Sequence, residues 1–160
     1  MENNKQVEIV TYNPKYLKSF KDLNIEWISN YFVVEPNDVK ALDHAEEYII
    51  SKGGEIFSAI LNDEVLGVCA LIKNDGTDYD YELAKMAVSP KAQGKRIGLL
   101  LAETAIKWAK EKGASKIYLE SNTKLKPAIK LYEKLGFQEI KGVSSGYNRV
   151  DIQMMLTLNS

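Results

Sequence analysis

The chain has 160 residues, a length typical of one domain with a substantial buried core, and we expect residues 1–160 to form that domain. Hydrophobic residues make up 45% and charged residues 27% of the chain, which is usual for a globular protein. The formal net charge of −1 excludes the strong basic excess of many nucleic-acid-binding and membrane-binding proteins, so neither partner is expected.

Cysteine content and the N-terminal sequence bear on the cellular setting. The single cysteine, Cys69, excludes a disulfide within the chain and a cysteine-rich zinc site, and no metal site is predicted. The first ten residues lack the apolar run of a secretory signal. No segment approaches the roughly 20 apolar residues that span a bilayer. We therefore expect a cytoplasmic protein.

The first half of the chain predicts two helices and three strands. A short strand at residues 7–10 is followed by an amphipathic helix that begins near Pro14 and extends to about Ile28. Residues 35–54 read as one second helix, which Gly53 and Gly54 end. Strands at 56–61 and 65–73 then form an antiparallel pair around a tight turn.

The second half predicts a strand at 81–88, a helix from Ile97 to Gly113, and a strand at 116–121. A helix at 127–135 and strands at 137–141 and 149–158 complete the chain. The total of about seven strands and four helices indicates an α+β fold. The unit from Tyr81 to Ser121 has the length of a right-handed crossover, so its two strands are expected to be parallel.

Residues 88–101 (VSPKAQGKRIGLLL) are the most informative segment. A strand ends there, and a loop with Gly94 and Gly98 leads into a helix whose first turn has free N–H groups. Together with the positive end of the helix dipole, this arrangement suits a pyrophosphate. The segment matches neither the Walker loop nor the Rossmann fingerprint. From these residues alone, an ordinary glycine-containing turn remains the alternative.

Two longer segments resemble the GNAT acetyltransferases. KMAVSPKAQGKRIGLLLAETAIKWAKEKGASKIYLESN is similar to motif A, whose loop is written Q/R-x-x-G-x-G/A. Gln93 takes the first position of that loop and Gly98 the last, while Arg96 replaces the middle glycine. NTKLKPAIKLYEKLGF is similar to motif B, whose characteristic positions are filled by Asn122, Ala128, Tyr132, Gly136 and Phe137.

The resemblance implies a GNAT-like mixed sheet and an N-acetyltransferase that uses acetyl-CoA. An amine would attack the thioester directly, with Glu82 as general base, as in the histone-acetylating branch, and Tyr132 as general acid. Backbone N–H groups near Met86–Val88 would stabilise the oxyanion. The residues implied in binding acetyl-CoA are Met86, Ala87, Val88, Gln93, Gly94, Lys95, Arg96, Ile97, Gly98, Leu99, Asn122, Ala128 and Tyr132.

Each of these assignments has a plainer alternative. Glu82 could be a solvated carboxylate at a strand edge, and Tyr132 a core aromatic side chain. His44 is expected to be solvated, and Cys69 to lie in the core. At the level of function, the alternative is a non-catalytic module that binds acyl-CoA without turnover. The near-zero net charge weakens a third hypothesis, a protein-modifying or nucleic-acid-associated role.

The acceptor site is the least determined part. Trp27, Tyr31 and Phe32 could wall a pocket for the amine, and Arg149 could pair with a substrate carboxylate. The residues do not separate a polyamine from an amino acid, an antibiotic or a peptide, so the substrate class is a small-molecule or peptide amine. The oligomeric state is open, with a homodimer as one option.

Overall fold

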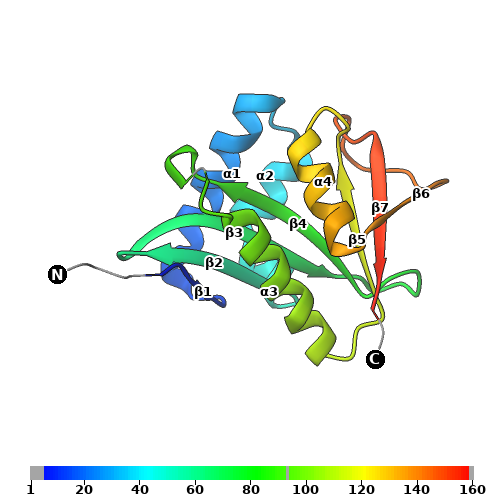
Figure 1. The fold of residues 1–160 in the computed structure, drawn as a ribbon, viewed down its shortest axis with the longest axis horizontal. Coiled ribbons are helices and arrows are strands. Elements are labelled where there is room, and N and C mark those ends of the chain that lie inside the picture. The colour runs from blue at the N-terminus through cyan, green and yellow to red at the C-terminus, as the bar shows by residue number, and fades with distance from the viewer. Residues whose placement is uncertain (1–5, 93, 159–160) are drawn as a thin grey trace.

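A computed structural model describes residues 6–92 and 94–158. Within those residues, seven strands form one mixed sheet, and four α-helices cover its two faces (Figure 1). The predicted α+β class is confirmed. No helix of the described part is long and apolar enough to cross a membrane, and no group of three or more His, Cys, Asp or Glu side chains there could hold a metal ion.

The boundaries agree with the predicted elements to within a few residues, apart from the second helix. The strands are β1 (Glu8–Val10), β2 (Glu55–Leu61), β3 (Glu64–Lys73), β4 (Tyr81–Val88), β5 (Lys116–Ser121), β6 (Gln138–Ile140) and β7 (Ile152–Thr157). The helices are α1 (Leu17–Tyr31), α2 (Pro36–Asp43), α3 (Ile97–Glu111) and α4 (Lys126–Leu135). Short helical turns lie at Pro14–Tyr16, Glu46–Ile50 and Pro90–Ala92.

The second helix was predicted as one element over residues 35–54, and this prediction is wrong. α2 ends at Asp43 because the His44 backbone leaves the helical region (φ −123°, ψ 39°), and a separate π-helical turn follows at Glu46–Ile50. The periodicity hid this break because Leu42, Ala45 and Ile49 are all buried and keep a helical spacing across it.

The strand order is β1-β2-β3-β4-β5-β7-β6, and every neighbouring pair is antiparallel except β4 and β5. The predicted parallel pair is therefore confirmed, with α3 as the crossover between its two strands. The two faces of β3 pack against different hydrophobic cores. Val68 and Ala70 pack with α1 residues on one face, whereas Cys69 and Leu71 pack with α3 on the other.

Two irregularities of β4 shape the centre of the molecule. Between the pairs Val68–Ala87 and Ala70–Ala84, β4 contains one residue more than β3, and Lys85 in this bulge has a positive φ of 54°. On its other side, β4 pairs with β5 only at Tyr81 and Glu82. Beyond Glu82 the two parallel strands diverge (Figure 1), and the space between them opens toward α1 and α4.

Candidate active site

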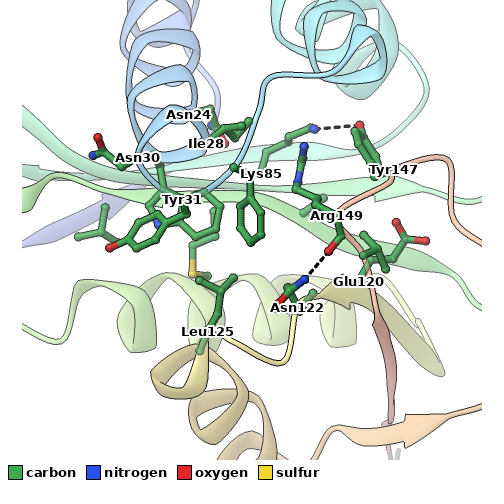
Figure 2. A pocket seen from close by; sticks show the side chains of 18 of the residues that line it. Asn24, Ile28, Asn30, Tyr31, Lys85, Glu120, Asn122, Leu125, Tyr147 and Arg149 are labelled. Atoms are coloured by element: carbon green, nitrogen blue, oxygen red, sulfur yellow. Dashed lines mark hydrogen bonds between the residues drawn. The ribbon is translucent and has the colours of Figure 1, made fainter.

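A cavity of about 600 Å³ lies where β4 and β5 part. Its walls come from α1, β4, β5, the loop after β5, α4 and the segment before β7. Figure 2 shows how side chains from these separate elements converge on it. The volume is in the range of small-molecule sites in proteins.

Glu82 lies on the cavity wall at the last position of β4 that pairs with β5, opposite Tyr118. Burial raises the pKa of its carboxyl to about 7; the nearby Glu120 adds to this rise and Lys85 opposes it. No described residue donates a hydrogen bond to this carboxylate. Glu82 can therefore exchange a proton near neutral pH with a group inside the cavity.

Tyr132 lines the same cavity from α4. Its ring packs edge-on against Phe137, with centroids 5.9 Å apart. Burial raises the pKa of its hydroxyl to about 12. The hydroxyl therefore stays protonated at neutral pH, as a proton donor must be.

Arg96 immediately precedes α3 as its N-cap, and its backbone is left-handed (φ 57°, ψ 32°). The first hydrogen bond of this helix runs from the Leu100 N–H to the Arg96 carbonyl oxygen (3.1 Å). The amides of Ile97, Gly98 and Leu99 thus lie in the turn that lacks intrahelical acceptors. No side chain among the described residues caps this end. Gln93, the first residue of the predicted loop motif, lies outside the described residues.

The strand β4 and the two helices α3 and α4 meet at Gly98. A Cβ added at Gly98 would lie 3.6 Å from the Met86 Sδ and 3.7 Å from a Leu131 methyl, so a larger side chain would reach into both. Met86 and Val88 line the cavity, and their side chains pack against the core on the α3 side. The Ala87 side chain instead packs in the core on the α1 side. Only the backbone of Ala87 could therefore take part in the site.

Asn122 and Ala128 both line the cavity, but the Asn122 side chain is already engaged. Its amide donates to the Arg149 carbonyl oxygen (2.6 Å), and its oxygen accepts from the Lys124 N–H (2.9 Å). Figure 2 shows the first of these bonds at the cavity edge. Asn122 therefore joins the end of β5 to the segment before β7.

The predicted acceptor wall of Trp27, Tyr31 and Phe32 lies at the α1 end of the cavity. The Trp27 ring is 5.1 Å from that of Tyr31 and 6.1 Å from that of Phe32, centroid to centroid. Lys124 covers this group, with its ammonium 4.2 Å from the Phe32 ring centroid and donating to the Tyr31 carbonyl oxygen (2.9 Å). The structure thus brings the three side chains together at this end of the cavity.

Arg149 lines the cavity, but its guanidinium is engaged within the protein. It donates to both carboxylate oxygens of Asp38, at 2.6 and 2.7 Å, and its contact with Glu35 is longer, at 3.5 Å. Lys85 donates to the same Asp38 carboxylate (2.8 Å) and to the Tyr147 hydroxyl (2.9 Å), as Figure 2 shows for the latter. A substrate carboxylate would have to displace Asp38 to reach Arg149.

We call these five residues, Glu35, Asp38, Lys85, Tyr147 and Arg149, the ion-pair cluster. Asp38 is fully buried at its centre. Burial alone would raise the pKa of Asp38, but hydrogen bonds from Arg149, Lys85 and the Glu35 N–H outweigh it and lower the pKa to about 2. The cluster joins the start of α2, the bulge of β4 and the segment before β7.

Two parts of the site were missed from the sequence. Glu120 lies two residues beyond Tyr118 on β5, and the predicted parallel pairing of β4 and β5 was the signal that could have placed it beside Glu82. The ion-pair cluster had no such signal, since Asp38 and Arg149 are more than a hundred residues apart in the chain.

The left-handed backbone at Arg96 gives a testable expectation. A non-glycine residue in this conformation costs about 1–2 kcal/mol of stability. Glycine removes this strain, but its greater conformational entropy in the unfolded chain offsets part of the gain. Arg96→Gly is expected to stabilise the protein by about 0.5–1 kcal/mol, measured by chemical denaturation. Lys95→Gly is the control, because Lys95 is exposed and has no positive φ, and it should destabilise. Equal effects of both changes would contradict the strain at Arg96.

Comparison with known proteins decides the family. Residues 20–137 match the model of the acetyltransferase (GNAT) family. The chain belongs to the GNAT family. Within it, the chain is 30% identical to the uncharacterized N-acetyltransferase YjgM of Escherichia coli (strain K12), over 90% of this chain and 87% of the relative. The predicted class, an acetyl-CoA-dependent N-acetyltransferase, is thereby confirmed.

Solved structures agree in fold. A GNAT-family acetyltransferase from Staphylococcus aureus Mu50 superposes with a TM-score of 0.85 at 24% identity, covering 96% of this chain and 99% of that one. The protein yncA of Salmonella typhimurium, solved with its cofactor acetyl-CoA, superposes with a TM-score of 0.73 at 20% identity, covering 97% and 95%. The mixed sheet seen here is thus the GNAT fold.

Proposed function

We propose that this GNAT protein transfers the acetyl group of acetyl-CoA to a primary amine of a small molecule or peptide by direct attack. One observation carries the proposal: Glu82 and Tyr132, from β4 and α4, line the same cavity with opposite proton-transfer properties. The pKa of Glu82 is raised to about 7, which suits a base, and that of Tyr132 to about 12, which suits an acid.

In this reaction Glu82 removes a proton from the substrate ammonium, directly or through a water molecule. The freed lone pair of the nitrogen attacks the thioester carbon, and a C–N bond forms. As the C–S bond breaks, the sulfur takes a proton from Tyr132. The attacking nitrogen gives up its second proton through water to Tyr132, and Glu82 releases the first proton to solvent, so the products are an amide, a free thiol and one proton.

The residues assigned to acetyl-CoA in this proposal lie at the start of α3 and on the cavity wall, where Met86, Val88, Asn122, Ala128 and Tyr132 are found. The amides of the first turn of α3, with Gly94 and Lys95 before it, would receive the pyrophosphate, supported by the open helix end and by the closeness of Gly98 to Met86. The Arg96 guanidinium would add a charge beside a phosphate. A backbone N–H between Met86 and Val88 would stabilise the carbonyl oxygen, and Ala128 would flank the acyl chain.

Release of free thiol from acetyl-CoA, measured with a panel of amines, tests this function. Amine-dependent release together with formation of the acetylated amine supports it. A protein that binds acetyl-CoA in calorimetry but releases no thiol with any amine class would instead be a non-catalytic acyl-CoA-binding module.

Tyr132→Phe is expected to lower the turnover number about a hundredfold and to change acetyl-CoA affinity much less. The ring and its contact with Phe137 remain, so the loss belongs to the hydroxyl, which acts as the sulfur leaves. Steady-state kinetics and calorimetry measure the two quantities. Tyr48→Phe is the matched control, because Tyr48 is exposed and lies outside the cavity. Normal turnover of Tyr132→Phe would leave Tyr132 as a core aromatic residue.

A further inference from the structure

The charges around the acceptor end of the cavity do not balance. Four carboxylates (Glu35, Asp38, Glu82 and Glu120) face two cations (Lys85 and Arg149) among the described residues of the ion-pair cluster and the β4–β5 wall. A third cation, Lys124, is bound at the α1 end by the Tyr31 carbonyl oxygen and the Phe32 ring. Lys85 and Arg149 are both bound to Asp38. Among the described residues, Glu82 and Glu120 are therefore left without a cation bound to either carboxylate.

Glu120 is held as an acceptor by neutral groups. The Tyr118 hydroxyl donates to one of its oxygens (2.7 Å), and the Ser145 hydroxyl donates to the other (2.8 Å). These hydroxyls orient the carboxylate without neutralising its charge. Figure 2 shows Glu120 on the cavity wall beside Arg149, whose guanidinium points toward Tyr147 and away from it.

The spacing of Glu82 and Glu120 follows from the strand register. Glu82 is paired with Tyr118 across the parallel strands. Glu120 lies two residues beyond Tyr118 on the same face, which is about 7 Å along the strand. Both residues line the cavity, with Cα atoms about 7 Å apart along the strands and at least one strand spacing, about 5 Å, apart across them. A short aliphatic diamine can span such a separation.

The two tyrosines next to these carboxylates, Tyr79 and Tyr118, add no charge of their own. The rings of Tyr79 and Tyr118 are stacked, with centroids 4.7 Å apart. Burial raises the pKa of Tyr79 to about 12, and the charges of Glu82, Glu120 and Asp78 contribute to the rise. Its hydroxyl is thus neutral in the physiological range, and the negative potential of this wall comes from Glu120 and from the ionised form of Glu82.

We propose that the acceptor is an amine with a second positive charge, such as a diamine or polyamine, whose distal ammonium binds Glu120 while its reacting amine faces Glu82. The inference rests on the proposed acetyl transfer and names its substrate class. An amino acid fits this wall poorly, because its carboxylate would approach Glu82 and Glu120 while Arg149 is held by Asp38.

A series of three acceptors of equal chain length tests the inference. Cadaverine has two ammonium groups, pentylamine has one, and δ-aminovalerate has one ammonium and one carboxylate. With the wild-type protein and acetyl-CoA, kcat/KM for cadaverine is expected to exceed that of each of the others at least tenfold. The excess should shrink as salt is added, because it depends on a charged contact.

Glu120→Gln tests the residue. Its amide keeps one oxygen to accept from one of the Tyr118 and Ser145 hydroxyls and offers an N–H to the oxygen of the other. It should reduce the cadaverine preference at least fivefold, through KM more than through kcat. Glu139→Gln is the matched control, because Glu139 is an exposed β6 carboxylate outside the cavity and should leave the preference unchanged. If Glu120→Gln does not fold, the comparison of the three acceptors with the wild-type protein still tests the inference.

The outcomes separate the two levels of the proposal. Absence of thiol release with every amine overturns the proposed function. Turnover of pentylamine or δ-aminovalerate as efficient as that of cadaverine overturns the inference and leaves acetyl transfer in place. An unchanged preference in Glu120→Gln also overturns the assignment of Glu120. Calorimetric binding of the three amines to the CoA-saturated protein gives the same ranking independently of turnover.

Discussion

Glu82→Gln is expected to lower the turnover number by about 10²–10⁴-fold, the usual contribution of a general base. Acetyl-CoA affinity should change much less, because the carboxylate acts on the amine in the transition state. Steady-state kinetics with a turned-over amine, and calorimetry with acetyl-CoA, measure the two quantities. The rate of the wild type should fall as the pH drops through about 7 and the carboxyl is protonated. The variant should not show this fall in rate at low pH.

The same substitution should stabilise the protein at high pH. Burial raises the folded-state pKa of Glu82 from 4.5 to about 7, so ionising it in the folded state costs free energy. Wild-type stability from this group is fully present below pH 4.5 and is lost as the pH rises through 7. Glu82→Gln is therefore expected to gain about 1–3 kcal/mol over the wild type at pH 8 and much less at pH 5, by urea denaturation.

Glu103→Gln is the matched control for both effects. Glu103 is exposed on α3 and does not line the cavity, so its amide variant should keep both the pH profile and the stability. Near-normal turnover of Glu82→Gln with an unaltered pH profile would show that Glu82 is a charged residue at the strand edge without a catalytic role. An unchanged stability difference between pH 5 and 8 would contradict its burial.

Asp38→Asn is expected to lower the free energy of unfolding by about 3–5 kcal/mol, the usual cost of removing one partner from a buried ion pair. The neutral amide would leave Lys85 and Arg149 largely buried without their shared carboxylate. Chemical denaturation at neutral pH measures the loss. Asp22→Asn is the matched control, because its pair with Lys18 is exposed and such pairs contribute less than about 1 kcal/mol.

The pH dependence gives a second measurement on Asp38. Its folded-state pKa lies near 2, below the ordinary 3.8, so its contribution is present above about pH 4 and is lost as the pH falls toward 2. The stability difference between the wild type and Asp38→Asn should therefore narrow over this interval. A loss below 1 kcal/mol at neutral pH would show that Lys85 and Arg149 are stable without this carboxylate.

The fold was largely predictable because its signals are local or nearly so. β4 and β5 were recognised from their apolar runs, and their parallel pairing from the length of the crossover that joins them. The break at His44 was missed because the buried residues on both sides keep helical spacing. Periodicity reports which side chains face the sheet, and it does not report how the backbone turns between them.

The candidate site was predictable in part. Glu82 and Tyr132 came from a family resemblance, the start of α3 came from its glycines and free helix amides, and the structure brings Glu82 and Tyr132 to one cavity. Arg149 was recognised as a residue of the acceptor side, but its pairing with Asp38 was not foreseen. Charge pairing between distant segments leaves no pattern of spacing, because either partner alone looks like an ordinary surface residue.

By itself the sequence determined the order of the elements, which depends on residue types at short, regular separations that periodicity and glycine placement record. Its resemblance to the GNAT family implied the acetyl-CoA chemistry and predicted Glu82 and Tyr132 as the catalytic pair. Only the tertiary structure decided the charge of the acceptor end. The bulge at Lys85 and the parting of β4 from β5 bring Asp38, Glu82, Glu120 and Arg149 together. Which cation neutralises which carboxylate depends on distances through space, and Coulomb interactions in a buried site are governed by those distances rather than by order along the chain.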